Sequence, residues 1–168
     1  MQKLIKAAVF TGVLATVGAA NAAINTTTFA VTATVATNCL VSATPLAFGT
    51  YAQGGGDLDQ QSAISVRCSN GTPFNVGLNP GATGGATVTT RRMVNGANQL
   101  AYQLFTNGAR TTNWGQTIGT DTVTGTGAGF AAANAVALNV YGRIPDTVAN
   151  QGLPAGNYTD TVTVTVTW

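Results

Sequence analysis

The chain has no histidine, and charged residues make up only 7% of its 168 residues. The missing histidine excludes an imidazole metal ligand and a catalytic histidine. Beyond residue 22 there are five arginines, five aspartates and no lysine or glutamate, so the net charge of this part is zero. Nucleic-acid binding needs clustered cations, so we expect no nucleic-acid partner. A neutral surface also lacks the repulsion that keeps copies of a protein apart.

Recognisable catalytic or ligand-binding patterns are scarce as well. The sequence contains no G-x-S-x-G and no carboxylate pair with catalytic spacing. Gly54 to Asp59 carries two carboxylates without a third, which favours a solvated turn over a calcium loop. Trp114 is interpreted as core packing rather than as a ligand platform beside Arg110, and Asp160 as a possible ion-pair partner of Arg110 or Arg143. We therefore expect no enzymatic activity, no cofactor and no metal site.

The first residues are typical of a secretion signal. Lys3 and Lys6 precede an apolar stretch from Ala7 to Ala20, and Ala20-Asn21-Ala22 fits a cleavage site. We predict a signal peptide over residues 1–22 and a mature chain that starts at Ala23.

Only two cysteines are present, Cys39 and Cys68. In an oxidising compartment such a pair most simply forms one disulfide, the alternative being two free thiols. Closing a loop of roughly 30 residues stabilises the fold by about 3–4 kcal/mol in the chain-entropy model.

The C-terminal residues alternate strictly between apolar and hydroxyl side chains. Val162, Val164, Val166 and Trp168 share one parity, and threonines occupy the other. Successive side chains of a strand point to opposite faces, so this pattern predicts a half-buried β-strand. Because the strand runs to the last residue, we expect an open position beside it for another segment.

Further short strands are expected between turn signals, which is typical of an all-β sandwich or barrel. The predicted strands are Leu46–Thr50, Ala63–Cys68, Phe74–Leu78, Thr87–Met93, Leu100–Phe105, Asp121–Thr126 and Val136–Gly142. Asn95-Gly96 predicts a hairpin. We interpret Ala128 to Ala137 as loop and strand rather than helix, and Pro145 to Pro154 as a long polar connection.

A second alternating segment lies near the predicted mature N-terminus. Phe29, Val31, Ala33 and Val35 share one parity. The pattern alone fits either an ordinary first strand of the same sandwich or a strand supplied to another molecule.

Several segments together resemble the spore coat protein U domain family, which includes subunits of archaic chaperone–usher pili. The resemblance rests on Thr28–Val35 before Cys39, Val66–Phe74, Arg91-Arg92-Met93, Leu100–Phe105, Ala109–Gly115, Val140–Pro145 and Gly156–Trp168. It covers essentially the whole mature chain, and the order and spacing of the pieces make it specific.

The resemblance implies an immunoglobulin-like, pilin-type β-sandwich that lacks one strand. Residues 23–37 would be the donor-strand segment, with Phe29, Val31, Ala33 and Val35 entering the groove of a neighbouring subunit. Residues 38–168 would be the pilin domain. Its strand with Tyr158, Val162, Val164, Val166 and Trp168 would line the groove and first bind a periplasmic chaperone, with chaperone cations holding the carboxylate of Trp168.

The predicted function is that of a structural subunit of a surface pilus, assembled by donor-strand exchange and supporting adhesion and biofilm formation. Its expected partners are identical or related subunits, the chaperone and an outer-membrane usher, and its route leads through the periplasm to the cell surface. The alternatives are a secreted spore-coat-type structural protein and a tip adhesin that binds a surface ligand.

Overall fold

The computed structural model describes residues 22–168, so nearly all of the predicted signal peptide lies outside the described residues. The chain divides into two units at Thr34, and each is considered by itself. Residues 22–34 form no helix or strand, and all of them are exposed. The folded unit is Val35–Trp168.

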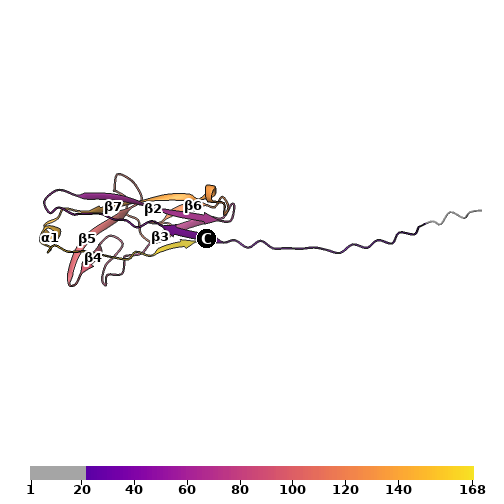
Figure 1. Ribbon diagram of the computed structural model, residues 1–168, viewed down its shortest axis with the longest axis horizontal. Coiled ribbons are helices and arrows are strands. Elements are labelled where there is room, and N and C mark those ends of the chain that lie inside the picture. Colours follow the sequence, from indigo (N-terminus) through magenta and orange to yellow (C-terminus); the bar gives the residue numbers. More distant parts are fainter. Residues whose placement is uncertain (1–21) are drawn as a thin grey trace, which may run out of the picture. The chain divides into compact units, whose positions relative to one another are not determined.

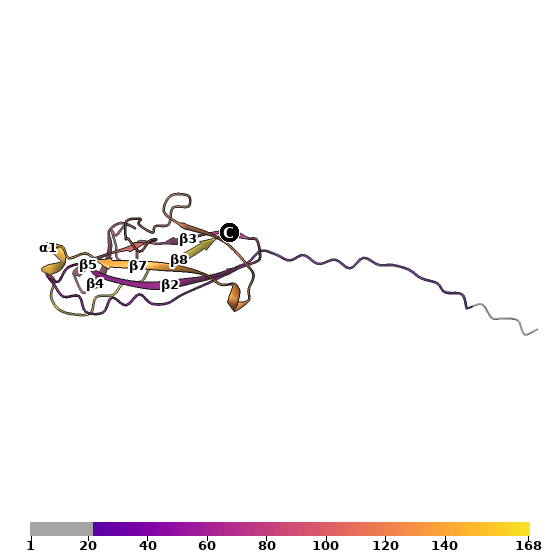
Figure 2. The same cartoon turned by 90° about the horizontal axis from the view of Figure 1, so that it is seen from above.

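The folded unit is an all-β sandwich, as the sequence predicts (Figures 1 and 2). One sheet has the strand order β1-β2-β7-β5-β4, and every pairing in it is antiparallel. Its strands are β1 (Cys39–Ala43), β2 (Leu58–Cys68), β7 (Val136–Ile144), β5 (Asn98–Phe105) and β4 (Arg91–Asn95).

The second sheet has the order β6-β3-β8 and is also antiparallel. It consists of β6 (Val123–Thr126), β3 (Pro73–Leu78) and β8 (Val164–Thr167). The core between the sheets is apolar because alternate residues of each strand face inward. Its fully buried members include Ile64 and Val66 of β2 and Phe74 and Val76 of β3.

Most predicted strands are confirmed, with shifted ends. The Asn95-Gly96 turn joins β4 to β5, and Gly96 has a φ of 59°, which suits a residue without a Cβ. β2 begins five residues before the predicted start, because its first residues pair with β7. The predicted strand Leu46–Thr50 is wrong, and β1 at Cys39–Ala43 was missed.

Within residues 22–168, helical structure is limited to two short elements. The η1 turn covers Ala132–Asn134, inside the segment predicted as loop and strand, and α1 covers Val148–Gln151, inside the predicted polar connection. The Thr147 side chain caps α1 by accepting from the Asn150 N–H. Over residues 22–168, no helix has the length and apolarity needed to cross a membrane.

Candidate functional site

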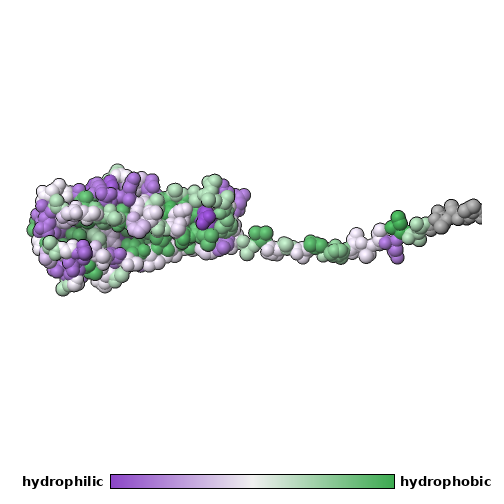
Figure 3. Space-filling model, viewed as in Figure 1, coloured by the Kyte–Doolittle hydropathy of each residue, from purple (hydrophilic) through white to green (hydrophobic). Residues whose placement is uncertain are grey.

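A groove with many apolar residues runs between two chain segments at the edge of the sandwich. One wall is the segment from Ala43 to Tyr51, and the other is the segment from Asn157 to Val164. Two cavities of about 290 and 760 Å³ lie along it, and both are bordered by Leu46, Phe48 and Met93. On the face shown in Figure 3, polar residues are concentrated toward the α1 end of the folded unit, and apolar residues gather toward the end that holds the C-terminus.

The second wall has the alternation that the sequence predicts. Tyr158, Val162, Val164 and Val166 are half-buried and pack against the core, whereas the intervening threonines are exposed. Trp168, at the same parity, is 54% exposed. The apolar side chains of this wall therefore face the groove, and the hydroxyls face outward.

The backbone of this wall pairs through its odd-numbered residues, and Thr159 exchanges two hydrogen bonds with Val94 of β4, at 2.8 and 3.1 Å. β8 has β3 as its single neighbour in the sheet order of the described residues. The Thr163 carbonyl accepts from the Asn79 N–H at 3.1 Å, and the Thr163 N–H donates to the Asn79 side chain at 2.8 Å. Because these groups alternate along a strand, the N–H and C=O of Val162, Val164 and Val166 point to the opposite, open edge. Such an edge is a template for another strand.

The first wall is also an edge. β1 pairs with β2 alone, from Cys39 opposite Cys68 to Ala43 opposite Ile64, and the Thr44 N–H continues the pairing to the Ala63 carbonyl at 2.9 Å. Pro45 then removes a donor, and the chain leaves the ladder. This departure explains why Leu46–Thr50 is not a strand although Phe48 still faces inward.

Gly142 of β7 fixes how closely the first wall approaches the sheet. A Cβ at this position would lie 2.8 Å from the Phe48 ring, a separation that real Cβ atoms do not show. The glycine thus lets Leu46 and Phe48 pack directly on the strand beneath them, and a side chain here would push the wall outward.

The groove is not uniformly wide. β1 and β8 approach within 8 Å between Cα atoms at the end of the folded unit where both lie side by side in Figure 1. A strand paired on both sides separates its neighbours by about 9.5 Å. The groove is therefore narrow at this end and open toward α1.

Among the described residues, Asp160 is the one charged residue that borders either cavity, among apolar residues and uncharged polar ones such as Ser62 and Gln53. Asp160 borders the smaller cavity, and its carboxylate accepts from the Tyr102 hydroxyl at 2.6 Å and the Ala82 N–H at 2.8 Å. Burial of Tyr102, together with this hydrogen bond, raises the pKa of its phenol. The suggested ion pair of Asp160 with Arg110 or Arg143 is wrong, because those arginines lie beside other aspartates.

Arg91 is fully buried. Its guanidinium donates to the carbonyls of Asn79, Val88, Leu78 and Trp114 at 2.7–2.9 Å. Burial lowers its pKa to about 10. Arg91 connects the edge strand β4 to the end of β3, and thereby joins the two sheets close to the groove.

The structure confirms that Trp114 is a core residue. It is fully buried, and its indole N–H donates to the Val76 carbonyl at 2.9 Å. The Arg110 guanidinium lies over the Tyr141 ring instead, 5.8 Å from its centroid.

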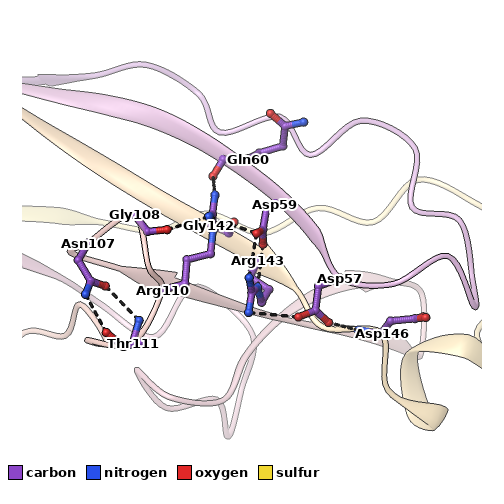
Figure 4. Close-up of polar contacts among 10 residues, drawn as sticks. All are labelled: Asp57, Asp59, Gln60, Asn107, Gly108, Arg110, Thr111, Gly142, Arg143 and Asp146. Carbon is purple, nitrogen blue, oxygen red and sulfur yellow. Dashed lines mark hydrogen bonds and ion pairs between the residues drawn. The ribbon is translucent and has the colours of Figure 1, made fainter.

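A charged cluster lies on β2, β7 and their flanking loops (Figure 4). Arg143 forms a bidentate pair with Asp59 at 2.7 and 2.8 Å and a further ion pair with Asp57 at 3.2 Å. Arg110 contacts Asp59 at 3.2 Å. The hydrogen bond from Arg143 holds the pKa of Asp59 below its usual value. Arg110 has a φ of 55°, a strained conformation for a residue with a side chain.

Asp146 binds the loop that follows the first wall, at residues 51–56. Its carboxylate accepts from the Tyr51 hydroxyl and from the N–H groups of Gly54 at 3.1 Å and Gly56 at 2.9 Å. The Tyr51 hydrogen bond, followed by those from the glycines, lowers the pKa of Asp146 to about 2. Burial and the bond to Asp146 raise the pKa of Tyr51 to about 12. These contacts hold the first part of the turn predicted at Gly54–Asp59, whereas Leu58 and Asp59 belong to β2 and Asp59 is ion-paired rather than solvated.

Cys39 and Cys68 are joined by the predicted disulfide. The bridge fixes the first residue of β1 to the last residue of β2, where the segment from Val35 enters the folded unit. Of the predicted donor residues, Phe29, Val31 and Val35 are 85%, 83% and 93% exposed. Their insertion into a neighbour remains a prediction.

No metal centre is found in the region that the structure describes, because no three His, Cys, Asp or Glu side chains are grouped to hold an ion.

The two sheets, the disulfide and the groove define an immunoglobulin-like sandwich of the pilin type. Residues 25–165 match the family described as Spore Coat Protein U domain, and the chain belongs to this family. It is similar to Protein U of Myxococcus xanthus, with 35% identity over 136 residues, which is 73% of this chain and 71% of that protein.

A solved structure shares the fold. It is the chaperone–tip adhesion subunit pre-assembly complex CsuC–CsuE, from the archaic chaperone–usher Csu pili of Acinetobacter baumannii. The TM-score is 0.53 and the sequence identity is 29%, over 80% of this chain. The match spans only 40% of the chain in that complex.

Proposed function

We propose that this protein is a structural subunit of a surface pilus and that its groove receives a β-strand from a neighbouring subunit. The observation that supports this most directly is the open edge of β8, where apolar side chains line a groove and backbone groups point into it. Strand addition satisfies such backbone groups and buries alternate side chains. Membership of the Spore Coat Protein U domain family and the likeness to a chain of a pilus complex support the same function.

Residues 23–37 are the donor segment in this proposal. Their alternate residues Phe29, Val31, Ala33 and Val35 match the period of a strand, and the three larger ones are more than 80% exposed. Burying those three side chains contributes about 5–9 kcal/mol before ordering costs. The proposed signal peptide over residues 1–22 directs the chain to the compartment in which the disulfide forms.

The geometry of the folded unit supports one orientation of the donor. The N-terminal segment enters the unit at Cys39, at the end where β2 finishes, and α1 lies at the other end. A donor antiparallel to β8 has its last residues beside Tyr158, near α1. Because Val35 and Cys39 are four residues apart, the donor's own folded unit then stands within about 14 Å of the α1 end.

This orientation makes assembly open-ended. Each subunit receives a strand at one end and extends its own strand from the other, so the contact is head-to-tail and generates a fibre. A donor parallel to β8 would instead place the neighbour's folded unit at Cys39, where the acceptor's own segment leaves.

An empty groove exposes apolar side chains and unpaired backbone groups, and thus promotes aggregation. We propose that a periplasmic chaperone covers the groove strand from Tyr158 to Trp168 in transit and that an outer-membrane usher exchanges it for the donor. The fibre at the cell surface then supports adhesion and biofilm formation. The similar solved structure is a pre-assembly complex of a chaperone with a tip adhesion subunit, which supports chaperone binding before assembly.

A spore-coat-type structural protein is the second candidate, because the family description and Protein U favour it. Both candidates share the fold and the groove and differ in where the assembled protein is deposited. Genes for a chaperone and an usher beside the gene for this chain would favour the pilus.

The test of donor-strand assembly uses the mature chain expressed with its chaperone. Deleting residues 23–36 is expected to abolish polymers and leave a chaperone-bound, disulfide-closed folded unit. Val31→Asp should block assembly in the same way, whereas Thr32→Ser, on the other face of the segment, should not. Polymers formed by the truncated chain would refute the donor role.

A further inference from the structure

The groove presents four inward side chains along its second wall, and they are not alike. Tyr158, Asp160, Val162 and Val164 border the two cavities. Three of them are large and mainly apolar, and Asp160 is the one that carries a carboxylate. The hydrogen bonds from Tyr102 at 2.6 Å and Ala82 at 2.8 Å hold that carboxylate in place.

The donor segment carries a complementary irregularity. Its four alternating residues are Phe29, Val31, Ala33 and Val35, so three positions are large and one is small. The donor and the wall thus each have four positions. In the donor the small residue Ala33 differs from the other three, and in the wall the charged residue Asp160 does.

We propose that Asp160 sets the register of the incoming strand by accepting Ala33 opposite it. In an antiparallel pair this places Phe29 opposite Val164, Val31 opposite Val162 and Val35 opposite Tyr158. The inference rests on the proposed donor-strand function and specifies its geometry.

Every neighbouring register is less favourable. A shift of two residues in one direction places Val31 opposite the carboxylate, and a shift in the other direction places Val35 there. Each would press a branched apolar side chain against a polar group without offering it a hydrogen bond. A shift of one residue would turn threonines into the groove.

The width of the groove agrees with this register. Val164 borders the smaller cavity, whereas Val166, two residues further along β8, borders neither cavity. The largest donor side chain, Phe29, therefore meets a cavity at Val164. The shift that brings Val35 to Asp160 would move Phe29 to Val166, which borders neither cavity.

The register can be measured by testing which pair of introduced cysteines forms a disulfide between subunits. Val162→Cys in the mature chain is combined in turn with Val31→Cys, Ala33→Cys or Phe29→Cys. Opposed residues in a hydrogen-bonded antiparallel pair have Cα atoms about 5.5 Å apart, within the roughly 4.4–6.8 Å that a disulfide spans. A displacement of two residues adds about 6.8 Å along the strand and prevents the bond.

The proposal expects a ladder of covalent multimers on non-reducing gels for the Val31→Cys combination alone. Each single-cysteine variant is the control for mispairing with Cys39 or Cys68. A ladder with Ala33→Cys or Phe29→Cys instead would overturn the register and leave donor-strand assembly intact. No ladder with any of the three would refute the donor assignment itself, and the register with it.

A second measurement tests the role of Asp160. Ala33→Val puts a larger apolar side chain opposite the carboxylate and is expected to slow polymer formation by about tenfold or more. Thr34→Val makes a β-branched apolar residue on the opposite face and should assemble at the wild-type rate. Equal rates for Ala33→Val and wild type would show that Asp160 does not select the register.

Discussion

Phe29 provides the sharpest measure of what the donor strand contributes to the assembly. Its side chain is 85% exposed in the separate subunit and, in the proposal, becomes buried between the two sheets of a neighbour. Removing a buried phenylalanine side chain costs about 3–5 kcal/mol when the surroundings do not collapse. At about 1.4 kcal/mol per factor of ten, Phe29→Ala should accelerate subunit dissociation by about a hundredfold to several thousandfold.

The assay follows the release of monomers from preformed fibres in a fixed denaturant concentration, by gel electrophoresis over time. Phe130→Ala is the matched control, because Phe130 is 40% exposed on a loop outside both cavities and should leave the release rate unchanged. The chaperone-bound form of Phe29→Ala should unfold like wild type, since the donor segment is not inserted there. Fibres of Phe29→Ala that release subunits as slowly as wild-type fibres would refute the burial of this residue.

Three further outcomes concern the folded unit. Arg91→Met should lower the free energy of unfolding by about 3–5 kcal/mol, because the carbonyls that the buried Arg91 bonds lose their donor, two of them in buried contacts and two in part-buried ones. Denaturant titration of assembled protein checks this, and a loss below about 1 kcal/mol would contradict it. The folded pKa of Asp146 lies at about 2, below the ordinary 3.8, so its contribution is present above pH 4 and is lost as the pH falls toward 2. Asp146→Asn should remove this part of the acid dependence of the denaturant midpoint, and an unchanged acid limb would contradict it. Gly142→Ala should displace the wall at Phe48 and slow assembly, whereas Gly84→Ala, with nothing within 4 Å of its Cβ, should not; equal assembly rates would refute the close-approach argument.

The local elements were largely predictable because their signals lie within a few residues of sequence. The alternation from Val162 to Val166 predicted a half-buried strand, and Asn95-Gly96 predicted the β4–β5 hairpin; the structure confirms both. The disulfide was predictable because the sequence contains only two cysteines, and the structure confirms their pairing. The strand predicted at Leu46–Thr50 is wrong, because the chain leaves its hydrogen-bonded ladder at Pro45. Phe48 nevertheless keeps an inward position, which imitates the pattern of a strand.

The long-range polar contacts were not predictable in this way. Asp160 bonds Tyr102, which lies 58 positions away in sequence, and Arg143 selects Asp59 across 84 positions. Nothing in the sequence distinguishes Arg91, whose guanidinium lies in the core, from Arg92, which bonds the Gln99 side chain in an exposed contact. Only the packing of the two sheets decides which arginine lacks access to solvent.

The sequence by itself therefore determined the β class, the disulfide and the two alternating segments, because a strand's period and a lone cysteine pair are properties of neighbouring or unique residues. The tertiary structure alone decided that β1 and β8 are both edges, that a groove lies between the segment that follows β1 and the segment that precedes β8, and that Asp160 borders this groove. These features depend on which strands become neighbours across the two sheets, and that choice is made by the summed burial of the whole core rather than by any single stretch of the chain.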